Sequence, residues 1–456
     1  MLSAKDNELI TRVGPGTPMG DLMRQYWVPA CLSSELPKPD GDPLRVLLLG
    51  ERLVAFRDTE GRVGLMPHQC PHKKASLFYG RNEEGGLRCV FHGWKFDVAG
   101  RCMDMPNEPP ERGFKDKLRA KAYPCVERAG LVWTYMGPRE TPPPMPALEV
   151  FDANPRDTTL MAYQVECNWL QAFENDLDIT HFGFLHGGHS EAEQLPEGSA
   201  LRELMRDRAP RYEVLDTAAG VMSGSYRTMP GGTMKSWYLQ NYLFPFFGQT
   251  GVGIGIGEKV ASGWTQKAAG ITMKVPMDDT HTMAFVIASG LAATTEDGSR
   301  EFYNDEMWRS LPLRPNTTDW LGRFRWIDGE HNDYGIDRDK QRSRVTFTGL
   351  SNVILEDTCM SESMDPIVDR TDEHLGVADL FHIRIRQRLI AAAKALADHG
   401  AVPPGVDNPD GYLIRPGFLE LPADLTIVDA AETLRVGDGG AHMPELAPKP
   451  WAREDA

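Results

Sequence analysis

The sequence predicts an α+β protein of two domains, in which a small all-β unit precedes a larger α+β unit. Short runs of aliphatic and β-branched residues, separated by turn residues, begin near Leu44. They recur up to a proline-rich segment at 141–146, which is typical of a stiff linker. Beyond it lie a helical stretch at 167–181, strand-like runs between 211 and 290, and a long helical stretch near 371–399. We therefore place the domain boundary at the proline-rich segment.

Composition narrows the class of protein. The chain has 456 residues, 41% of them hydrophobic and 25% charged, which is typical of a globular protein of two or three domains. Its net charge of −16 disfavours nucleic acid and anionic lipid as partners. The N-terminus lacks a secretory signal, and no apolar run reaches the ~20 residues of a membrane span. We expect a soluble cytoplasmic protein that binds no membrane.

The seven cysteines are an odd number spread thinly over the chain, which favours buried thiols and metal ligands over disulfides. Two of them belong to a spaced pattern, Cys70-Pro71-His72 followed by Cys89-Val90-Phe91-His92. Zinc fingers usually keep both cysteines in one loop. Here each loop offers one sulfur and one nitrogen, the arrangement of a Rieske [2Fe-2S] cluster, in which two thiolates hold one iron and two imidazoles the other. A structural zinc site and a chance coincidence are the alternatives.

A second group of ligand-type residues lies in the larger domain. Asp178, His181 and His186 form the pattern D-x2-H-x4-H. If the segment is helical, Asp178 and His181 are neighbours on one helix face, and the carboxylate can hydrogen-bond near the imidazole. Two histidines and one carboxylate on one side of an iron leave positions open, as in non-haem iron oxygenases. Taken alone, this pattern more often marks polar residues at a helix end.

Together the two patterns indicate a known family. The chain resembles the large (alpha) subunit of Rieske non-haem iron aromatic ring-hydroxylating oxygenases, most closely the branch of phthalate dioxygenase and phenoxybenzoate dioxygenase. The resemblance covers nearly the whole chain. Besides the two cysteine–histidine loops, it rests on the segments 11–20, 168–172, 332–334, 341–342, 347–349, 362–364 and 366–370.

The resemblance implies a role for each candidate residue. The [2Fe-2S] ligands would be Cys70, His72, Cys89 and His92, and the mononuclear iron would be bound by His181, His186 and a C-terminal aspartate. We choose Asp357 as that third ligand. The competing carboxylates are Glu356, Glu362, Asp365 and Asp369.

One departure from the family lies in the first cluster loop. Lys73 and Lys74 follow the cluster histidine, where the family commonly has arginine and glycine. The positive charge persists, but a glycine able to adopt a positive φ is lost, which puts the local loop geometry in question.

The resemblance also implies how the chain is organised. Residues 1–23 would pack on the catalytic domain, 24–140 would form the Rieske domain, and 141–456 would form a helix-grip-like catalytic domain with an antiparallel sheet. Asp178 would not bind iron but would connect His181 to His92 of a neighbouring subunit, so electrons would cross between chains. This implies a ring-shaped homotrimer or a pair of stacked trimers.

By the same resemblance, the chain is the terminal oxygenase of a multicomponent system. It would use O2 and electrons from NADH, delivered by a separate flavin and [2Fe-2S] reductase, to hydroxylate or dihydroxylate an aromatic acid. The alternatives are an O-demethylase that releases formaldehyde and, more remotely, an electron-transfer protein without catalysis. An acid substrate needs a local positive charge, for which the candidates are Arg202, Arg206, Arg208 and Arg211. The aromatic stretch 236–257 has no charged residue, so if it lines the pocket, the positive charge must come from elsewhere in the chain.

Overall fold

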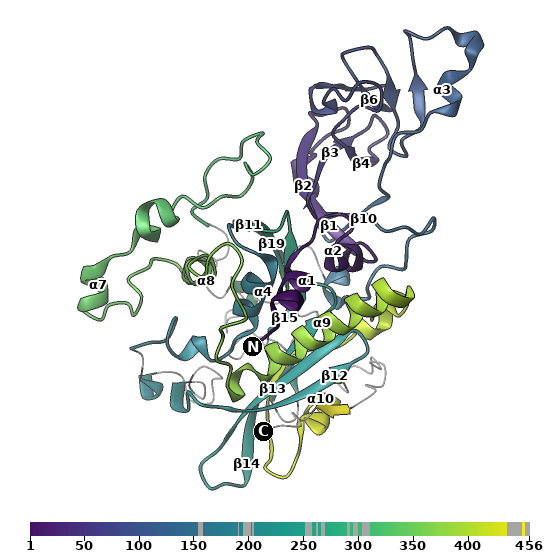
Figure 1. Cartoon of the computed structure of the whole chain (residues 1–456). Coiled ribbons are helices and arrows are strands. Elements are labelled where there is room, and N and C mark those ends of the chain that lie inside the picture. Colours follow the sequence, from purple (N-terminus) through teal and green to yellow (C-terminus); the bar gives the residue numbers. More distant parts are fainter. Residues whose placement is uncertain are drawn as a thin grey trace.

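The structure is a computed structural model. It describes residues 1–153, 158–189, 191–194, 202, 205–250, 258–260, 263–265, 270–289, 292–294, 300–302, 311–435 and 449–451. A small β-rich domain extends away from a larger body that is built on a wide sheet and covered by helices (Figure 1). This is the α+β organisation that the sequence predicts.

Two short helices open the chain. α1 (Ala4–Thr11) is capped by Ser3 and α2 (Pro18–Met23) by Thr17, whose side-chain oxygens each accept a hydrogen bond from a backbone N–H of the first turn. Both helices pack against α9 of the larger domain, and α1 also contacts α4. The N-terminal segment therefore lies on the larger domain before the chain enters the small one.

The small domain consists of three antiparallel sheets, in the orders β2-β3-β4, β5-β6-β7-β8 and β1-β10-β9. Its only α-helix among the described residues is the single turn α3 (Phe114–Lys117). The strands are β1 (Trp27–Leu32), β2 (Leu44–Leu48), β3 (Glu51–Arg57), β4 (Val63–Pro67), β5 (Arg81–Glu83), β6 (Gly86–Arg88), β7 (Lys95–Phe96), β8 (Cys102–Asp104), β9 (Cys125–Arg128) and β10 (Leu131–Tyr135).

The larger domain has one main antiparallel sheet, in the order β11-β19-β18-β15-β14-β13-β12-β23. β22 pairs with β14 and β17, and β17 also pairs with β16, while β20 and β21 form a separate hairpin. The strands are β11 (Thr158–Val165), β12 (Arg211–Thr217), β13 (Gly220–Thr228), β14 (Met234–Leu243), β15 (Phe247–Gln249), β16 (Glu258–Val260), β17 (Gly263–Thr265), β18 (Ile271–Pro276), β19 (Thr282–Ser289), β20 (Ala292–Thr294), β21 (Arg300–Phe302), β22 (Gly417–Pro422) and β23 (Lys449–Trp451).

Two helices of the larger domain are shorter than the sequence predicts. α9 (Leu380–His399) starts at Leu380 rather than near residue 371 and ends at Gly400, whose φ is +63°. α4 (Trp169–Leu177) starts after Asn168, whose side chain accepts a hydrogen bond from the first turn, and stops at Leu177. The described ranges also contain α7 (Arg338–Arg342), α8 (Val353–Glu362) and α10 (Ile427–Arg435). None of the helices in the described ranges is long and apolar enough to cross a membrane.

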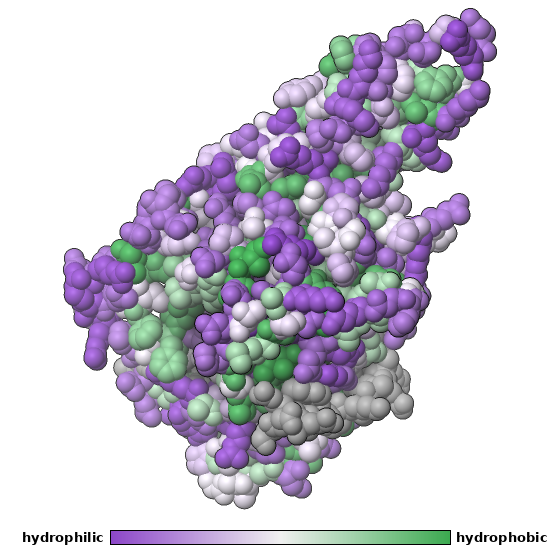
Figure 2. Space-filling view, in the orientation of Figure 1, coloured by the Kyte–Doolittle hydropathy of each residue, from purple (hydrophilic) through white to green (hydrophobic). Residues whose placement is uncertain are grey.

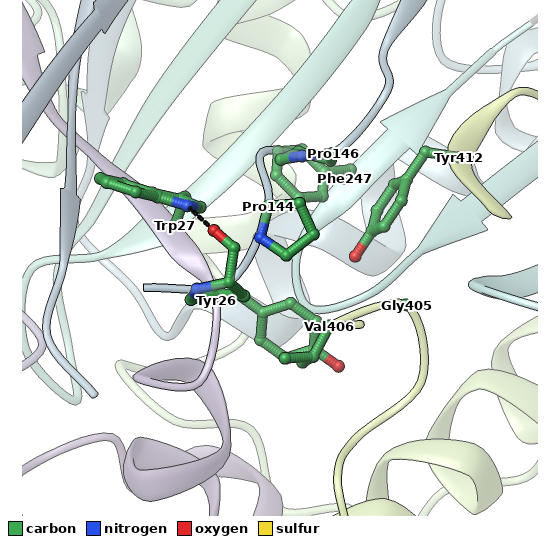
Figure 3. A pocket seen from close by; sticks show the side chains of 9 residues that line it. Tyr26, Trp27, Pro144, Pro146, Phe247, Gly405, Val406 and Tyr412 are labelled. Atoms are coloured by element: carbon green, nitrogen blue, oxygen red, sulfur yellow. Dashed lines mark hydrogen bonds between the residues drawn. The ribbon is translucent and has the colours of Figure 1, made fainter. Parts of the chain in front are cut away.

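The proline-rich segment between the domains is packed rather than free. The indole N–H of Trp27 donates a hydrogen bond to the carbonyl of Pro143 at 2.8 Å (Figure 3). Pro144 and Pro146 lie near Tyr412 around a cavity of only 10 Å³ (Figure 3). Because the linker is held on both sides, it fixes how strand β1 meets the larger domain.

A second contact between the domains comes from the segment before α7. The Arg323 guanidinium pairs with the Glu35 carboxylate at 2.6 Å, and both side chains are largely buried. Trp320 of the same segment meets the ring of His68 edge-on, at 5.1 Å between ring centroids. His68, which lies just outside the ligand pattern, is therefore a packing residue in this structure.

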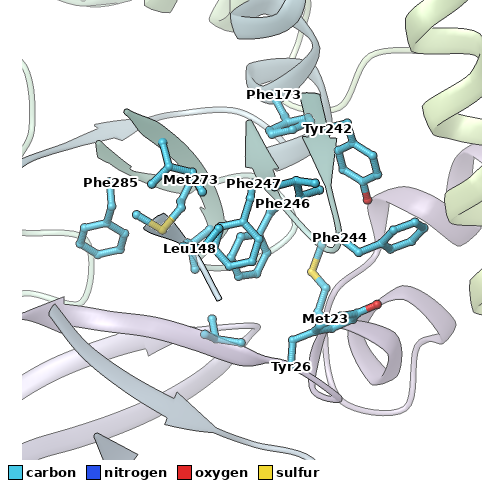
Figure 4. Packing of buried hydrophobic residues seen from close by; sticks show 14 of the residues in the cluster. Met23, Tyr26, Leu148, Phe173, Tyr242, Phe244, Phe246, Phe247, Met273 and Phe285 are labelled. Atoms are coloured by element: carbon cyan, nitrogen blue, oxygen red, sulfur yellow. The ribbon is translucent and has the colours of Figure 1, made fainter. Parts of the chain in front are cut away.

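Helix α4 lies on the main sheet with its apolar side inward. Phe173 meets Tyr242 of β14 edge-on at 5.5 Å between centroids, within a cluster that also holds Phe244 and Phe247 (Figure 4). Contacts with β15 and β18 complete this packing. The apolar residues of the helix recur at the spacing of one helix face, so burial of this face fixes its rotation.

The other side of α4 is polar and also buried. Glu174 accepts hydrogen bonds from Arg370 at 2.9 Å and from both Nε and Nη2 of Arg386 on α9. Arg386 also pairs with Glu373. Burial raises the pKa of Glu174, but the two arginines outweigh this effect and hold the pKa well below its usual range. This ion-pair network fastens α4 to α9.

We predict that Glu174→Gln destabilises the protein at neutral pH by about 3–5 kcal/mol, because two buried arginines lose their shared carboxylate. A lowered carboxyl pKa adds stability above the unfolded pKa of about 4.3, and this stability is lost as the pH falls toward the folded pKa. The urea midpoints of wild type and variant should therefore converge below about pH 4. Glu8→Gln is the control. It removes the carboxylate of the Arg12–Glu8 ion pair, which is 67% exposed, and should shift the midpoint little.

Candidate metal centres

The two cysteine–histidine loops of the small domain have the same backbone conformation. In each loop, the cysteine carbonyl accepts a hydrogen bond at 2.9 Å from the residue four positions later, Lys74 or Gly93. The N–H groups of Cys70 and Cys89 each donate at 2.8 Å to the carbonyl five positions later. The two loops therefore share one pattern of backbone hydrogen bonds, although the histidine follows the cysteine by two residues in the first loop and by three in the second.

This shared conformation answers the question raised by the missing glycine. Gly93 has a φ of +80°, and a Cβ on it would lie 2.5 Å from Cγ of Pro106. The matching position of the first loop is Lys74, which has a φ of +64°. The loop geometry is thus retained, with a lysine in the left-handed region that normally favours glycine.

The four candidate cluster ligands converge at the ends of these loops. Cys70 and Cys89 are buried and their thiols are adjacent, and burial, together with the neighbouring Cys89, raises the pKa of Cys70 to about 11. His72 and His92 are partly exposed, with ring centroids 4.5 Å apart, and His72 stacks on Trp94 at 4.3 Å. Two sulfurs on the buried side and two nitrogens on the surface side fit the donor set of a Rieske cluster.

Exposed hydrophobic side chains lie beside the partly exposed His92. Val90 and Phe91, between Cys89 and His92, are 58% and 59% exposed. Phe91 contacts His92 at 3.9 Å between centroids. Figure 2 shows a mostly hydrophilic surface with hydrophobic groups at the outer end of the small domain. The tip of this domain is thus a surface where exposed imidazole and exposed apolar groups lie together.

The second candidate centre joins the segment after α4 to helix α8. His181 opens a single 3-10 turn, His186 follows it, and Asp357 lies in the middle of α8. The Nε2 atoms of the two histidines are 3.0 Å apart, and Oδ1 of Asp357 lies 3.1 Å from His186 and 3.5 Å from His181. Within the described part of the chain, no other three histidine, cysteine, aspartate or glutamate residues have ligand atoms that all lie within 4.8 Å of one another.

The geometry and the charges of this cluster fit a metal. Ligand atoms about 2.1 Å from an ion at adjacent octahedral corners lie about 3 Å apart, as these atoms do. Oδ1 of Asp357 is buried and accepts no well-aligned hydrogen bond from the described residues. Burial lowers the pKa of His181, whereas Asp357 and Glu356 overcome burial and raise the pKa of His186 to about 9. Metal binding at His186 would therefore displace a proton.

The competing carboxylates lie away from the space between the two histidines, or they form hydrogen bonds with other groups. Glu362 accepts hydrogen bonds from Tyr334 and from the backbone of Glu166. Asp369 caps a turn at Thr371. Asp365 is exposed, and its backbone carbonyl binds Gln171. Glu356 contacts the outer nitrogen of His186 rather than the side that faces His181.

Asp178 does not have the helical placement that the sequence predicts. The helix ends at Leu177, and Asp178 is in an extended conformation, so Asp178 and His181 are not neighbours on one helix face. Its Oδ1 accepts hydrogen bonds from the backbone N–H of Thr180 at 2.7 Å and from its hydroxyl at 2.6 Å. Burial lowers the pKa of His181, and the charges of Asp357 and Asp178 oppose this effect only in part. Nδ1 of His181 is buried with no hydrogen-bond partner among the described residues.

Sequence reasoning missed the residues that hold the triad in place. Asn175 of α4 donates a hydrogen bond to the carbonyl of Asp357 at 2.8 Å and another to the hydroxyl of Ser361, which fixes α8 against α4. Thr348 donates its hydroxyl hydrogen to Glu356. The sequence does not single out Asn175, because the same helix also carries the polar residues Gln171, Glu174 and Asp176.

Two further features lie near the triad. Ile179, Tyr238 and Phe418 form a buried hydrophobic group, to which the aromatic stretch 236–257 contributes Tyr238; residues 251–257 of that stretch lie outside the described residues. Arg206 and Arg208, two of the four candidate anchors, line a polar cavity of 620 Å³ together with His189 and other residues. Gly188, which follows His186 by two residues, also lines this cavity.

Two family models match the chain. The model described as "Rieske [2Fe-2S] domain" matches residues 26–124, and the model described as "LigXa C-terminal domain like" matches residues 134–409. The chain is also 41% identical to the oxygenase subunit of 3-chlorobenzoate-3,4-dioxygenase from Comamonas testosteroni, over 92% of this chain and 96% of that one. The chain belongs to the Rieske non-haem iron oxygenases. It is therefore an enzyme with a Rieske [2Fe-2S] cluster and a mononuclear iron.

Other comparisons agree with this assignment. The Rieske oxygenase described here is 34% identical to the oxygenase subunit of phthalate 4,5-dioxygenase from Pseudomonas putida, over 87% of each chain, which confirms the expected branch. Dicamba monooxygenase shares its fold, with a TM-score of 0.54 at 19% identity over 83% of this chain and 99% of that chain. The expected fold class is likewise confirmed.

We predict that Lys74→Gly stabilises the small domain of this Rieske oxygenase by about 0.5–1 kcal/mol. Relief of the left-handed lysine exceeds the extra entropy that glycine gives the unfolded chain. The measurement is the temperature at which the visible absorption of the cluster is lost, which should rise. Lys73→Gly, at a position without a positive φ, should lower it slightly, and a fall for both variants would contradict the prediction.

Proposed function

We propose that this Rieske oxygenase hydroxylates or dihydroxylates an aromatic carboxylic acid. Relatives that cover most of the chain include dioxygenases named for chlorobenzoate, phthalate and phenoxybenzoate, all of them aromatic acids. Within the chain, Arg206 and Arg208 line a cavity beside the segment that carries His186, which supplies positive charge in a protein of net charge −16. We place the enzyme in the cytoplasm and retain the domain boundaries 1–23, 24–140 and 141–456.

The observation that carries the proposal is the His181, His186 and Asp357 triad, whose donor atoms lie 3.0–3.5 Å apart. We assign these residues to the mononuclear iron, and Cys70, His72, Cys89 and His92 to the cluster. When bound, the two groups supply the redox chemistry by which dioxygen is activated. The chain itself would hold and orient them, and Phe182, which packs against the buried group around Ile179 and Tyr238, contacts the rings of both triad histidines.

Electrons would reach the iron from a neighbouring subunit. The small domain extends away from the body that carries α4 and α8, and strand β6 lies at the far end of this domain (Figure 1). Cys89 directly follows β6 in the chain. The exposed apolar tip at Val90 and Phe91 is suited to docking on another chain. We therefore propose a head-to-tail homotrimer, single or stacked, in which Asp178 links His181 to His92 of the next subunit, and a separate flavin and [2Fe-2S] reductase that delivers electrons from NADH.

Oxygen uptake tests the function. With a reductase and NADH, the enzyme should consume O2 with at least one acid of a panel of chlorobenzoates, phthalates and phenoxybenzoates and yield a dihydrodiol or a hydroxylated acid. Stoichiometric formaldehyde from a methoxybenzoate, with no uptake on the other acids, would make it an O-demethylase instead. NADH-dependent cluster reduction without uptake on any substrate would leave only electron transfer.

We predict that Asp357→Asn lowers the iron content from about three to about two atoms per chain, because the triad loses its charged ligand while the cluster keeps its own. Elemental analysis and the visible spectrum of the cluster measure the two centres separately. Asp369→Asn, the exposed competitor, is the control and should keep all three irons. Full iron in Asp357→Asn would contradict the assignment.

We predict that Asp178→Asn retains both metal centres but slows turnover at least tenfold, because the charged link between cluster and iron is lost.

Co-expression of His92→Ala with Asp357→Asn tests the crossing of electrons between chains. In mixed oligomers, an intact cluster of one chain would face an intact iron site of another, so activity should exceed that of either variant alone. No recovery in isolated mixed oligomers would count against the inter-subunit route.

A further inference from the structure

Glu356 is a buried carboxylate that directly precedes Asp357 on α8. Its side chain is about one-tenth exposed, and its Oε2 lies 2.7 Å from Nδ1 of His186. Its Oε1 accepts a hydrogen bond from the hydroxyl of Thr348. A buried carboxylate is costly unless its oxygens are satisfied, and here each oxygen has a partner.

The two acidic residues bracket one imidazole. Successive positions on a helix are about 100° apart, so Asp357 and Glu356 leave α8 in different directions. Asp357 lies 3.1 Å from Nε2 of His186, and Glu356 lies 2.7 Å from Nδ1 of the same ring. The ring is therefore held at both ends, and its Nε2 faces the proposed iron position.

This contact selects the tautomer of His186. A carboxylate can only accept at Nδ1, so Nδ1 carries the hydrogen, and in the neutral ring Nε2 has the lone pair that would bind a metal. The other histidine lacks this support within the described part of the chain, since Nδ1 of His181 is buried there without a hydrogen-bond partner. The two histidines of the triad are thus held unequally.

We propose that Glu356 is a positioning residue that orients His186 and strengthens its bond to the mononuclear iron, with Thr348 fixing the carboxylate. This inference rests on the proposed assignment of His181, His186 and Asp357 as iron ligands. Hydrogen bonding from behind raises the basicity of a ligating imidazole, and loss of such a partner typically costs 10- to 100-fold in metal affinity.

Thr348 connects this carboxylate to the segment between α7 and α8. Its hydroxyl oxygen also accepts a hydrogen bond from the backbone N–H of Leu350 at 3.1 Å, so its position is fixed. The same residue lines a cavity of 550 Å³ with Leu185, the neighbour of His186, and with Phe347. Thr348 therefore supports Glu356 from the side that faces this cavity.

Metal affinity of the iron-depleted enzyme, with its cluster intact, tests the proposal. We expect Glu356→Gln to bind Fe(II) and Co(II) 10- to 100-fold more weakly than wild type and to release Fe(II) faster to a chelator. The visible spectrum of the Co(II) form should shift, because the orientation or basicity of one imidazole changes. The cluster spectrum should be unchanged, which also shows that the variant is folded.

Glu362→Gln is the matched control. Glu362 also lies on α8, is partly buried and accepts two hydrogen bonds, but it has no hydrogen bond to a histidine among the described residues. It should leave the metal affinity and the Co(II) spectrum unchanged. Thr348→Val keeps the shape of the side chain while removing its donor, and should weaken binding in the same direction by a smaller factor. It provides the measurement if Glu356→Gln does not fold.

Asp357→Asn separates this inference from the assignment on which it rests. If Asp357→Asn abolishes Co(II) binding while Glu356→Gln and Thr348→Val match wild type, the assignment stands and the positioning role is wrong. If Glu356→Gln abolishes binding as fully as Asp357→Asn, Glu356 is itself a ligand and the proposal is overturned. If Asp357→Asn binds like wild type, the ligand assignment has failed.

Discussion

The structure around the iron triad depends on the buried polar side of helix α4. Each polar side chain of this helix is tied to a segment far away in the sequence. Asn168 donates to the carbonyls of Thr11 and Asp279, Gln171 donates to the carbonyls of Ser361 and Asp365, and Asp176 pairs with Lys274 of β18. Because buried polar groups must be paired, these bonds tolerate little rearrangement.

The triad inherits its geometry from this helix. Asn175 holds the backbone of Asp357 at 2.8 Å, while the histidines follow a few residues after the helix ends. One helix thereby sets the distance between proposed iron ligands that are about 170 positions apart in sequence. Glu174, tied to α9 through Arg386, prevents the helix from sliding on the sheet.

In the small domain, the candidate cluster ligands are held in position in a different way. Its two ligand loops are short and are held by their own backbone hydrogen bonds, with one left-handed residue in each. The second loop uses Gly93, and the first places Lys74 in a conformation that costs a lysine about 1–2 kcal/mol. The cluster site is therefore built locally, whereas the iron site is assembled by long-range packing.

This difference explains what the sequence determined by itself. Ligands that are close in the chain have fixed spacings, so Cys70, His72, Cys89 and His92, with the small β domain, could be predicted from residues alone. The histidine pair was predicted for the same reason. The sequence pointed to Asp357 but left Glu356 as a competitor. Only the tertiary structure placed Asp357 near Nε2 of both histidines and Glu356 near Nδ1 of His186, because neighbours on a helix point in different directions. It also moved Asp178 off the helix face, since a local hydrogen bond to Thr180 replaced the next helical turn.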